Sequence, residues 1–394
     1  MFFYQKIKNK KMKTNCVICN SKRLKKIISF EKFPVFMGAT NLTKNLFIYN
    51  DLIYGSCLDC NNLQILDLID LNILYQENHN TEVVGKTWEN HNTSFANFIK
   101  ESKPDVVLEI GSPSATVYKK IQNEEWLKKW YSIEPNPCKI DNINDKYKTI
   151  IGFIDDQFSF DKFKIEKAKT IVMSHVFEHL HNPSQILNNL FNQLPEGGSV
   201  IISIPNMSHI SKKNLMPPSG LHFEHSYYID LNNAEFLFKN AGFKIEKSEF
   251  FENHSIFIKA IKLKIKTKIN INDKLKKTNV ESIKNLNNTV IKYKKTVEKI
   301  NSKMLLSKND VYIYGSHFPA QFLKCLGLNL NKIFGCLDQS KTKIGKTLYG
   351  TNWTVYHPDI LKDKKDVSVI CYMGPYTNEI KESLLKINNK IKFL

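Results

Sequence analysis

Five short apolar runs rich in β-branched residues recur along the middle of the chain, and polar or amphipathic stretches separate them. The runs are residues 106–110, 131–134, 149–154, 170–174 and 199–204. Segments with helical spacing follow the first run at 117–130 and the fourth at 184–194. Strands that alternate with helices predict a parallel, doubly wound sheet, so we expect an α/β fold. Residues 243–248 and 255–266 would close this sheet as an antiparallel pair.

The flanking segments have different patterns. Residues 76–102 carry a partial apolar stripe and predict a helix. Residues 267–308 contain no Gly or Pro and predict one or two solvent-exposed helices that act as a connector. A smaller α/β unit follows, with a helix expected at 320–328 and strands expected at 311–314, 333–337 and 367–372. The chain therefore divides into segments 13–75, 76–266, 267–308 and 309–394.

The eight cysteines fall into two groups. Cys16 and Cys19 form one Cys-x-x-Cys pair, Cys57 and Cys60 form a second, and the other four are scattered. Two such pairs supply the four thiolates that tetrahedral Zn²⁺ prefers, so we expect a zinc-binding module over 13–75; a redox pair is the alternative. A closed four-thiolate site leaves no open coordination position, so this zinc would hold the fold without chemistry.

The composition is that of a globular protein, with 42% hydrophobic and 24% charged residues, which argues against disorder. Lys and Arg exceed Asp and Glu by 57 − 38 = 19, and residues 261–308 supply 14 − 3 = 11 of this excess. That stretch is also rich in Asn and Ile, so we attribute much of the charge to compositional bias, with a polyanion-binding face as the alternative. We expect no membrane-spanning helix, no signal peptide and a cytoplasmic location.

Two predicted strands of the central sheet end on carboxylates. Glu109 lies near the end of the first strand, and Glu134 ends the second, 25 residues later. In doubly wound sheets ligands bind at the carboxyl ends of the strands, where a carboxylate can accept both hydroxyls of a ribose. We therefore expect an adenosine-type cofactor at this edge, with a merely solvated strand end as the alternative.

The motifs of the central segment carry a family resemblance. VVLEIGSPSA, SIEPNP, GFIDD, SHVFEHLHNP and LPEGGSVIISIPN, in this order, resemble the class I S-adenosylmethionine-dependent methyltransferases. With the four-cysteine segment, GKTWENH, YIYGS, LDQSKTKIGKTLYGTN and CYMGPYTNEI, the chain is similar to the zinc-containing sugar C-methyltransferases that act on nucleotide-linked deoxysugars. The resemblance covers essentially the whole chain from about Cys16. It implies a Rossmann-like methyltransferase domain between a zinc-binding module and a smaller Rossmann-like C-terminal domain.

The resemblance also implies how S-adenosylmethionine would be held. The expected contacts are Glu109, Gly111 and Ser112 with the methionine part, Glu134 with the ribose, Phe153 and Ile154 with the adenine, and Ser174 and His175 along the pocket wall. Pro113 and Ala115 stand where this loop commonly has glycine. Proline removes an amide donor and fixes φ, so this chain departs from the glycine-rich pattern.

The catalytic candidates lie in residues 220–228. The family typically has Tyr-His-Glu-His here; Glu224 and His225 match it, whereas His222 and Phe223 replace the tyrosine and the first histidine. Methylation of carbon requires a base over the carbon next to a carbonyl, whereas oxygen or nitrogen already offers a lone pair. We expect His222 or His225 to act as the base, with Glu224 orienting an imidazole.

Other histidines are open to two interpretations. His79, His91 and His254 either contact the substrate or pack in the core. Helical spacing in residues 175–179 is compatible with a metal, but it matches the ordinary end of the fourth strand in this superfamily, so we expect none there. Residues 315–317 follow a strand like a phosphate-binding turn but lack the further glycines of a dinucleotide site, so we expect no NAD.

We therefore predict an enzyme that transfers a methyl group from S-adenosylmethionine to a sugar, carried by a nucleotide, in glycan or glycoconjugate biosynthesis. C-methylation is favoured, and an O- or N-methyltransferase on an amino sugar or related glycan precursor is the alternative. A zinc nucleic-acid-binding protein and a cofactor-free binding module are rivals from other classes. The expected partner is a small-molecule sugar or nucleotide sugar, with no nucleic acid and no membrane; the oligomeric state stays open.

Overall fold

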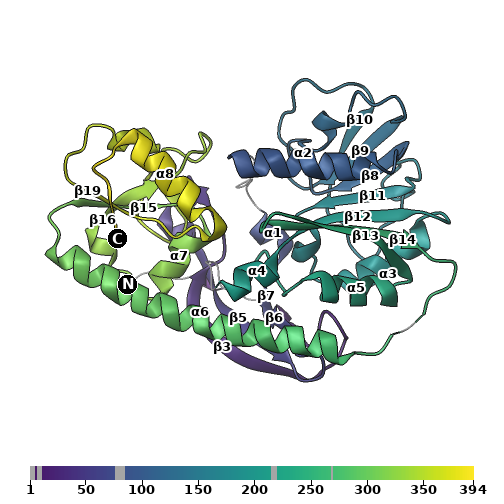
Figure 1. Ribbon diagram of the computed structural model, residues 1–394, viewed down its shortest axis with the longest axis horizontal. Helices are drawn as coiled ribbons and strands as arrows, with labels where there is room; N and C mark the ends of the chain where they lie inside the picture. The colour runs from purple at the N-terminus through teal and green to yellow at the C-terminus, as the bar shows by residue number, and fades with distance from the viewer. Residues whose placement is uncertain (1–4, 7–10, 76–84, 214–219, 268) are drawn as a thin grey trace.

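The computed structural model describes residues 5–6, 11–75, 85–213, 220–267 and 269–394. Two lobes stand side by side, and one long helix runs along the base of both (Figure 1). The strands of the N-terminal module lie between the lobes, behind this helix (Figure 1). No helix in the described ranges has the length and apolar character needed to cross a membrane.

The larger lobe is built on a seven-stranded sheet with the order β10-β9-β8-β11-β12-β14-β13. Its strands are β8 (Val106–Ile110), β9 (Lys129–Glu134), β10 (Tyr147–Ile151), β11 (Thr170–Ser174), β12 (Ser199–Pro205), β13 (Phe243–Phe251) and β14 (Ser255–Lys262). The first five strands in this order run parallel, and β14 pairs antiparallel with β12 and β13. Every residue of β8 and β12 is buried, as expected of strands covered on both faces. The predicted doubly wound α/β fold is thus confirmed.

Helices cover both faces of this sheet (Figure 1). They are α2 (Lys86–Lys100), α3 (Pro183–Gln193), α4 (Met207–Lys212) and α5 (Leu231–Asn240). Asp230 caps α5 by accepting a hydrogen bond of 3.0 Å from the Asn233 N–H. The helix predicted over 76–102 is observed from Lys86 onwards, and residues 76–84, including His79, lie outside the described part.

Two local predictions in this lobe are wrong. Residues 117–130 do not form an α-helix but a 3-10 turn, η2 (Tyr118–Lys120), followed by further turns. The side chains of Asn144 and Lys146 donate hydrogen bonds to the carbonyls of Gln122 and Glu124, at 3.1 and 3.2 Å. These carbonyls therefore bond to another segment and not within a helix. Strand β14 ends at Lys262 instead of 266, and Ile265 is 76% exposed, because β12 offers no partner beyond Ser199.

The N-terminal module is a mostly antiparallel sheet. Its long strand β5 (Ile48–Cys57) pairs antiparallel with β3 (Leu24–Pro34) and β6 (Leu63–Ile65) and parallel with the short β1 (Gln5–Lys6). The shorter elements are β2 (Lys11–Met12), β4 (Ala39–Thr40), η1 (Lys44–Leu46), β7 (Asp67–Leu68) and α1 (Leu71–Leu74). Phe33 is fully buried, and its ring centre lies 5.9 Å from that of Phe223 and 5.3 Å from that of Phe318. The module is therefore packed into the cores of both lobes.

The smaller lobe is a five-stranded parallel sheet with the order β18-β16-β15-β19-β20. Its elements are β15 (Asp310–Tyr314), α7 (Phe318–Cys325), η5 (Leu330–Lys332), β16 (Ile333–Leu337), β18 (Val355–Tyr356), η6 (Pro358–Leu361), β19 (Val367–Ile370), η7 (Gly374–Tyr376), α8 (Thr377–Ile387) and β20 (Lys392–Phe393). Strand β17 (Thr347–Leu348) is not part of this sheet and pairs with β4 of the N-terminal module. The lobe is thus joined to the N-terminal module by backbone hydrogen bonds.

The lysine-rich connector is one helix of 34 residues, α6 (Asp273–Leu306). We expected solvent-exposed helices, but α6 buries one stripe along its length: Leu275, Asn279, Ser282, Leu286, Thr289, Val290, Tyr293, Val297, Ile300 and Met304. Steps of three and four residues keep this stripe on one face. Buried Asn279 donates to the Cys60 carbonyl at 2.8 Å and accepts from Asn233 at 3.0 Å. The helix is therefore part of the core.

Candidate active site

One large cavity lies where the carboxyl ends of β8, β9 and β11 face the smaller lobe. Its volume is about 1250 Å³, above the ~300–1,000 Å³ of pockets for one drug-sized ligand. The N-terminal module and both lobes contribute to its wall, with Tyr75 from the module and Tyr376 from η7 of the smaller lobe. The predicted cofactor and catalytic residues all line it: Glu109, Gly111, Ser112, Glu134, Phe153, Ile154, Ser174, His175, His222, Glu224 and His225.

The loop after β8 has the backbone shape of a glycine-rich loop with fewer glycines. Gly111 has φ +74°, and a Cβ there would lie 2.5 Å from Cγ2 of Val176. Ala115, which stands where glycine is common, takes the left-handed φ of +54°. The Pro113 carbonyl accepts a hydrogen bond of 2.9 Å from the Cys138 N–H. The loop thus takes positive φ at two positions, of which only one is glycine.

Two buried carboxylates face this loop. Glu109 accepts a hydrogen bond of 2.8 Å from the Trp130 indole, and burial raises the pKa of its carboxyl to about 7. Glu134 ends β9 and accepts a hydrogen bond of 2.9 Å from the Asn136 N–H, and burial raises its pKa as well. Both carboxylates line the cavity at adjacent parallel strands. They can therefore meet one ligand, as the adenosine-type prediction requires.

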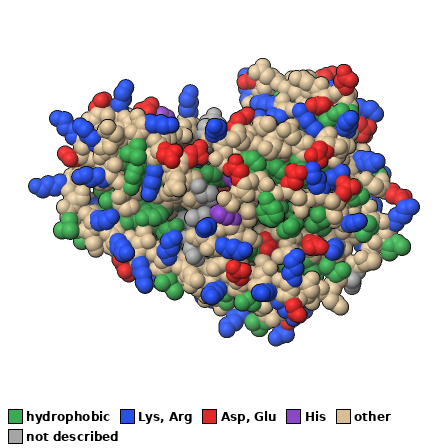
Figure 2. Space-filling model, viewed as in Figure 1, with side chains coloured by type: hydrophobic (Ala, Val, Ile, Leu, Met, Phe, Trp, Pro, Cys, Tyr) green, Lys and Arg blue, Asp and Glu red, His purple; other side chains and the backbone are tan. Residues whose placement is uncertain are grey.

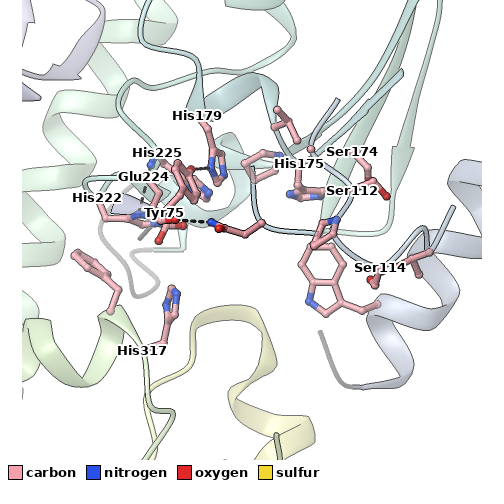
Figure 3. A pocket seen from close by; sticks show the side chains of 18 of the residues that line it. Tyr75, Ser112, Ser114, Ser174, His175, His179, His222, Glu224, His225 and His317 are labelled. Atoms are coloured by element: carbon pink, nitrogen blue, oxygen red, sulfur yellow. Dashed lines mark hydrogen bonds between the residues drawn. The ribbon is translucent and has the colours of Figure 1, made fainter. Parts of the chain in front are cut away.

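His225 is held in one tautomer by its surroundings. Its Nδ1 lies 2.8 Å from the Gly220 carbonyl, which can only accept, so Nδ1 carries the proton. In the neutral ring Nε2 then has a free lone pair, and it lies 3.9 Å from Oε1 of Glu178. His222 packs over His225 with ring centres 4.0 Å apart, and burial keeps the pKa of His222 well below its usual range. Figure 3 shows both rings beside Glu224.

Glu178 was not singled out from the sequence as a catalytic group. It lies on η3 (Phe177–His179), is fully buried, and its carboxylate makes no hydrogen bond within the described residues. Three imidazoles surround its Oε1: His175 Nδ1 at 3.3 Å, His225 Nε2 at 3.9 Å and His179 Nε2 at 4.0 Å. Burial raises the pKa of Glu178, so this carboxylate needs a nearby positive charge to be ionised at low cost.

Tyr75 is a second residue that sequence reasoning missed. Its hydroxyl lies 2.5 Å from Nδ1 of His179, and both side chains line the cavity (Figure 3). Tyr75 follows α1 at the end of the N-terminal module, 104 residues from His179. No local pattern marks it, because only the packing of the module against the larger lobe brings the two together.

A second group of imidazoles surrounds Trp88 on α2. Ring centres lie 4.6 Å from Trp88 for His254, 4.9 Å for His175 and 5.2 Å for His91. Burial lowers their pKa values to about 2, 3 and 3, so all three rings are neutral at pH 7. His91 bonds to Ser203 at 2.8 Å away from the cavity wall, whereas His254 lines the wall. Of the two interpretations, packing fits His91.

The four N-terminal cysteines come together as two matching turns. Sγ of Cys16 lies 3.5 Å from that of Cys60, and Sγ of Cys19 lies 3.6 Å from that of Cys57. After each Cys-x-x-Cys comes an asparagine with φ 61°, Asn20 or Asn61, whose N–H bonds back to the first cysteine of its pair. Four ligands at ~2.3 Å from a tetrahedral zinc lie about 3.8 Å apart, so these thiols fit that ion.

Two further groups have ligand atoms within 4.8 Å of one another: His91, His175 and His254, and Glu178, His179 and His225. In the first group Ser203, Ser255 and Tyr376 already bind ring nitrogens. In the second, a cation would occupy the Nε2 lone pair of His225. Hydrogen bonds between neutral side chains therefore explain why the first group lies together. In the second group, a bound metal would prevent His225 from acting as a base.

Comparison with known proteins gives one family match. Residues 89–248, less than half of the chain, match the family described as "Methyltransferase domain". A search of curated protein sequences finds no match. This match and the fold together place a methyltransferase domain in the larger lobe.

Three solved structures illustrate the structural similarity. A proposed O-methyltransferase from Nostoc punctiforme is 16% identical, with 45% of this chain, 57% of that protein and a TM-score of 0.35. Magnesium protoporphyrin IX methyltransferase from Synechocystis, with bound S-adenosylhomocysteine, is 12% identical. The match covers 45% of this chain and 84% of that protein, with a TM-score of 0.33. An N-methyltransferase from Bradyrhizobium japonicum is 12% identical. The match covers 45% of this chain and 96% of that protein, also with a TM-score of 0.33. The chain thus spans little more than half of the first of these proteins.

Proposed function

We propose that this enzyme methylates a sugar at a carbon next to a carbonyl, and that a nucleotide carries the sugar. The observation that supports this most is His225, whose tautomer is fixed with Nε2 free beside the cavity and near a buried carboxylate. A base in this position is needed for carbon, whose proton must be removed before the carbon can attack a methyl group.

The proposed reaction begins with proton transfer from the sugar carbon to Nε2 of His225. The resulting imidazolium lies 3.9 Å from Glu178, and its charge compensates the buried carboxylate. S-adenosylmethionine supplies an electrophilic methyl group; the new bond joins that methyl to the sugar carbon, and the carbon–sulfur bond breaks to leave S-adenosylhomocysteine. Positioning of the two ligands and the general base together provide the rate enhancement.

Two side chains are placed to bind the sugar carbonyl. The hydroxyl of Tyr75 and the imidazole of His179 are joined at 2.5 Å and line the cavity near His225, whose ring centre lies 4.8 Å from that of His179. A hydroxyl or N–H aimed at a carbonyl oxygen stabilises the negative charge that develops there when the neighbouring carbon loses its proton. One of the two protons of this neutral pair joins Tyr75 to His179 and the other remains for the carbonyl, so we assign that role to the pair.

The size of the cavity supports a nucleotide-bearing sugar. Its wall continues from His222 to the smaller lobe, where Lys341, Lys343 and the turn at Gly315 line it. Lys343 pairs with Asp338 at 3.4 Å, and Lys341 supplies a further positive charge at this end, which suits phosphate groups. Outside this cavity, Lys and Arg are spread over the visible face rather than gathered in one patch (Figure 2), which favours compositional bias over a polyanion-binding face.

We also propose that the four N-terminal thiolates hold a structural Zn²⁺. All eight cysteines are free, which fits a reducing compartment such as the cytoplasm. Because Asn279 on α6 binds the Cys60 carbonyl, zinc would also stabilise the position of α6.

The first experiment is calorimetric titration of zinc-loaded protein with S-adenosylmethionine and S-adenosylhomocysteine. We expect micromolar, near-stoichiometric binding; absence of binding of either by folded protein would contradict the enzyme. Nucleotide sugars are then screened as acceptors, and NMR of the product separates a carbon-bound methyl from a methoxy or N-methyl group. A methoxy or N-methyl product would establish the alternative, an O- or N-methyltransferase.

The role of His225 is tested by His225→Gln, with His357→Gln on the surface as the matched control. Loss of a general base typically costs ~10²–10⁴-fold in rate. We expect this loss for His225→Gln with unchanged S-adenosylmethionine affinity, and no loss for His357→Gln. A rate within threefold of the original for His225→Gln would exclude His225 as the base.

A further inference from the structure

We propose that Tyr376 of the smaller lobe is a positioning residue for the active site of the larger lobe. It orients a chain of hydrogen bonds through His254 and Ser255 to His175, whose Nδ1 lies 3.3 Å from the carboxylate of Glu178. Docking of the smaller lobe would thereby set the state of the carboxylate beside His225. The catalytic consequence rests on the proposed function, whereas the orientation of the chain does not.

The chain of contacts is continuous across the two lobes. The Tyr376 hydroxyl lies 2.6 Å from Nε2 of His254, and Nδ1 of the same ring lies 2.5 Å from Oγ of Ser255. That Oγ lies 2.8 Å from Nε2 of His175, and Nδ1 of His175 lies 3.3 Å from Oε1 of Glu178. Tyr376 comes from η7, and the other residues come from the loop before β14, the ends of β14 and β11, and η3.

The number of protons available makes the directions of these hydrogen bonds depend on one another. Each neutral imidazole carries one N–H and one lone pair, and Ser255 has a single hydroxyl proton. Ser255 therefore donates to one of its two histidine partners and accepts from the other. If it donates to Nε2 of His175, the His175 proton is on Nδ1, close to Glu178, and His254 also has its proton on Nδ1. If any link reverses, every link must reverse.

The two orientations differ in what they offer Glu178. In the forward orientation an N–H of His175 lies 3.3 Å from the carboxylate, which favours its charged form. In the reverse orientation a lone pair of His175 faces the carboxyl group, which favours its protonated form. Only a charged Glu178 can compensate an imidazolium at His225.

The Tyr376 hydroxyl gives the forward orientation its direction. Among the described residues its hydrogen-bond partner is Nε2 of His254, at 2.6 Å, so the hydroxyl proton is satisfied only if it is donated to that nitrogen. Burial raises the pKa of Tyr376, so this proton is kept. The forward orientation satisfies every group from Tyr376 to His175.

The other titratable groups around the chain do not reverse it. His91 faces His254 from α2 and is neutral, and Glu379 on α8 lies near Tyr376, where its charge also keeps the hydroxyl protonated. His179 and His225 face Glu178 and favour its charged form. His175 has φ +52°, a strained value for a residue with a side chain, and this turns the backbone at the end of β11 where its ring bridges Ser255 and Glu178.

The tautomers can be read directly by two-bond ¹H–¹⁵N NMR on the full zinc-loaded chain with ¹⁵N-labelled histidine. Signals of His254 and His175 are assigned from His254→Gln and His175→Gln. We expect both rings to carry the proton on Nδ1 between pH 6 and 9. In Tyr376→Phe we expect His175 to show both tautomers or the Nε2–H form, although it does not touch Tyr376 in the chain of contacts.

Tyr372→Phe is the matched control, because in the described part of the chain the Tyr372 hydroxyl bonds within the smaller lobe, to the Leu394 carbonyl at 3.3 Å. It should leave His175 unchanged. Ser255→Ala breaks the chain in the middle and should change His175 as Tyr376→Phe does; it provides the test if Tyr376→Phe fails to fold. A wild-type His175 with its proton on Nε2, or a change confined to His254 in both variants, would overturn the proposal.

Activity gives the second measurement once an acceptor is known. Loss of one hydrogen bond that orients the chain should lower kcat of Tyr376→Phe about tenfold. Tyr372→Phe should stay within twofold. If no sugar is methylated, the proposed function fails while the tautomer result still decides the orientation of the chain.

Discussion

Replacement of Gly111 by alanine should disrupt the cofactor loop in a measurable and separable way. Gly111 has φ +74°, where a side chain is strained, and the new Cβ would lie 2.5 Å from Cγ2 of Val176. The backbone strain costs ~1–2 kcal/mol and the forced repacking ~1–3 kcal/mol. We therefore expect Gly111→Ala to lower the free energy of unfolding by about 2–5 kcal/mol.

Two further variants separate these costs. Gly197 lies in the same domain with φ +67°, and its only neighbour within 4 Å of a new Cβ is the flexible Lys169 side chain, at 4.0 Å. Gly197→Ala should therefore show the backbone cost alone, about 1–2 kcal/mol. Val176→Ala combined with Gly111→Ala removes the atom in the way and should recover most of the repacking cost.

The assay is urea unfolding followed by tryptophan fluorescence, since Trp88, Trp126 and Trp130 all lie in the larger lobe. Calorimetry on the folded variants adds the affinity for S-adenosylmethionine, which should fall at least tenfold in Gly111→Ala and stay unchanged in Gly197→Ala. Equal destabilisation by Gly111→Ala and Gly197→Ala, or no recovery in the double variant, would refute the close approach of Val176 as the cause.

Three other outcomes follow from the structure. Cys57→Ser should abolish stoichiometric zinc in elemental analysis and lower the melting temperature, whereas Cys138→Ser, outside the cluster, should keep its zinc. Because burial raises the pKa of Glu109 from 4.5 to about 7, its stabilising protonated form is lost as pH rises through this window. The unfolding free energy of the wild type should thus fall relative to Glu109→Gln by up to about 3 kcal/mol; equal pH slopes would contradict this. Asn279→Ala should lower the free energy of unfolding by about 1–3 kcal/mol in urea, because the buried Cys60 carbonyl of the N-terminal module and the Asn233 amide of α5 each lose a hydrogen bond.

The sequence predicted the features that depend on short-range patterns. Continuous apolar runs such as 170–174 and 199–204 are strands because both faces of a parallel sheet are buried, and Glu109 and Glu134 meet because parallel strands end at one edge. The helix expected at 117–130 failed because the same apolar spacing is satisfied by turns whose carbonyls bond to another segment.

The parts that sequence reasoning missed depend on contacts between distant segments. The many lysines of α6 led us to expect an exposed helix. One face of α6 is nevertheless buried, because a helix can carry an apolar face packed on other elements and a charged face toward solvent. Tyr75, Glu178 and Tyr376 belong to three different segments, and their importance arises only where the N-terminal module and the two lobes meet. No spacing within a single segment marks such residues.

The position of the N-terminal module between the two lobes affects how the chain folds during its synthesis. Gln321 binds the Phe36 carbonyl at 2.9 Å, and the Tyr349 hydroxyl accepts from the Ile48 N–H, 301 residues away in the chain. At ~5–20 residues per second, a ribosome needs about 15–60 s to supply these partners. During this interval the aromatic side chains of the nascent module face water or a chaperone. Early metal capture by its cysteines would keep the first-made sheet intact until the last-made lobe arrives.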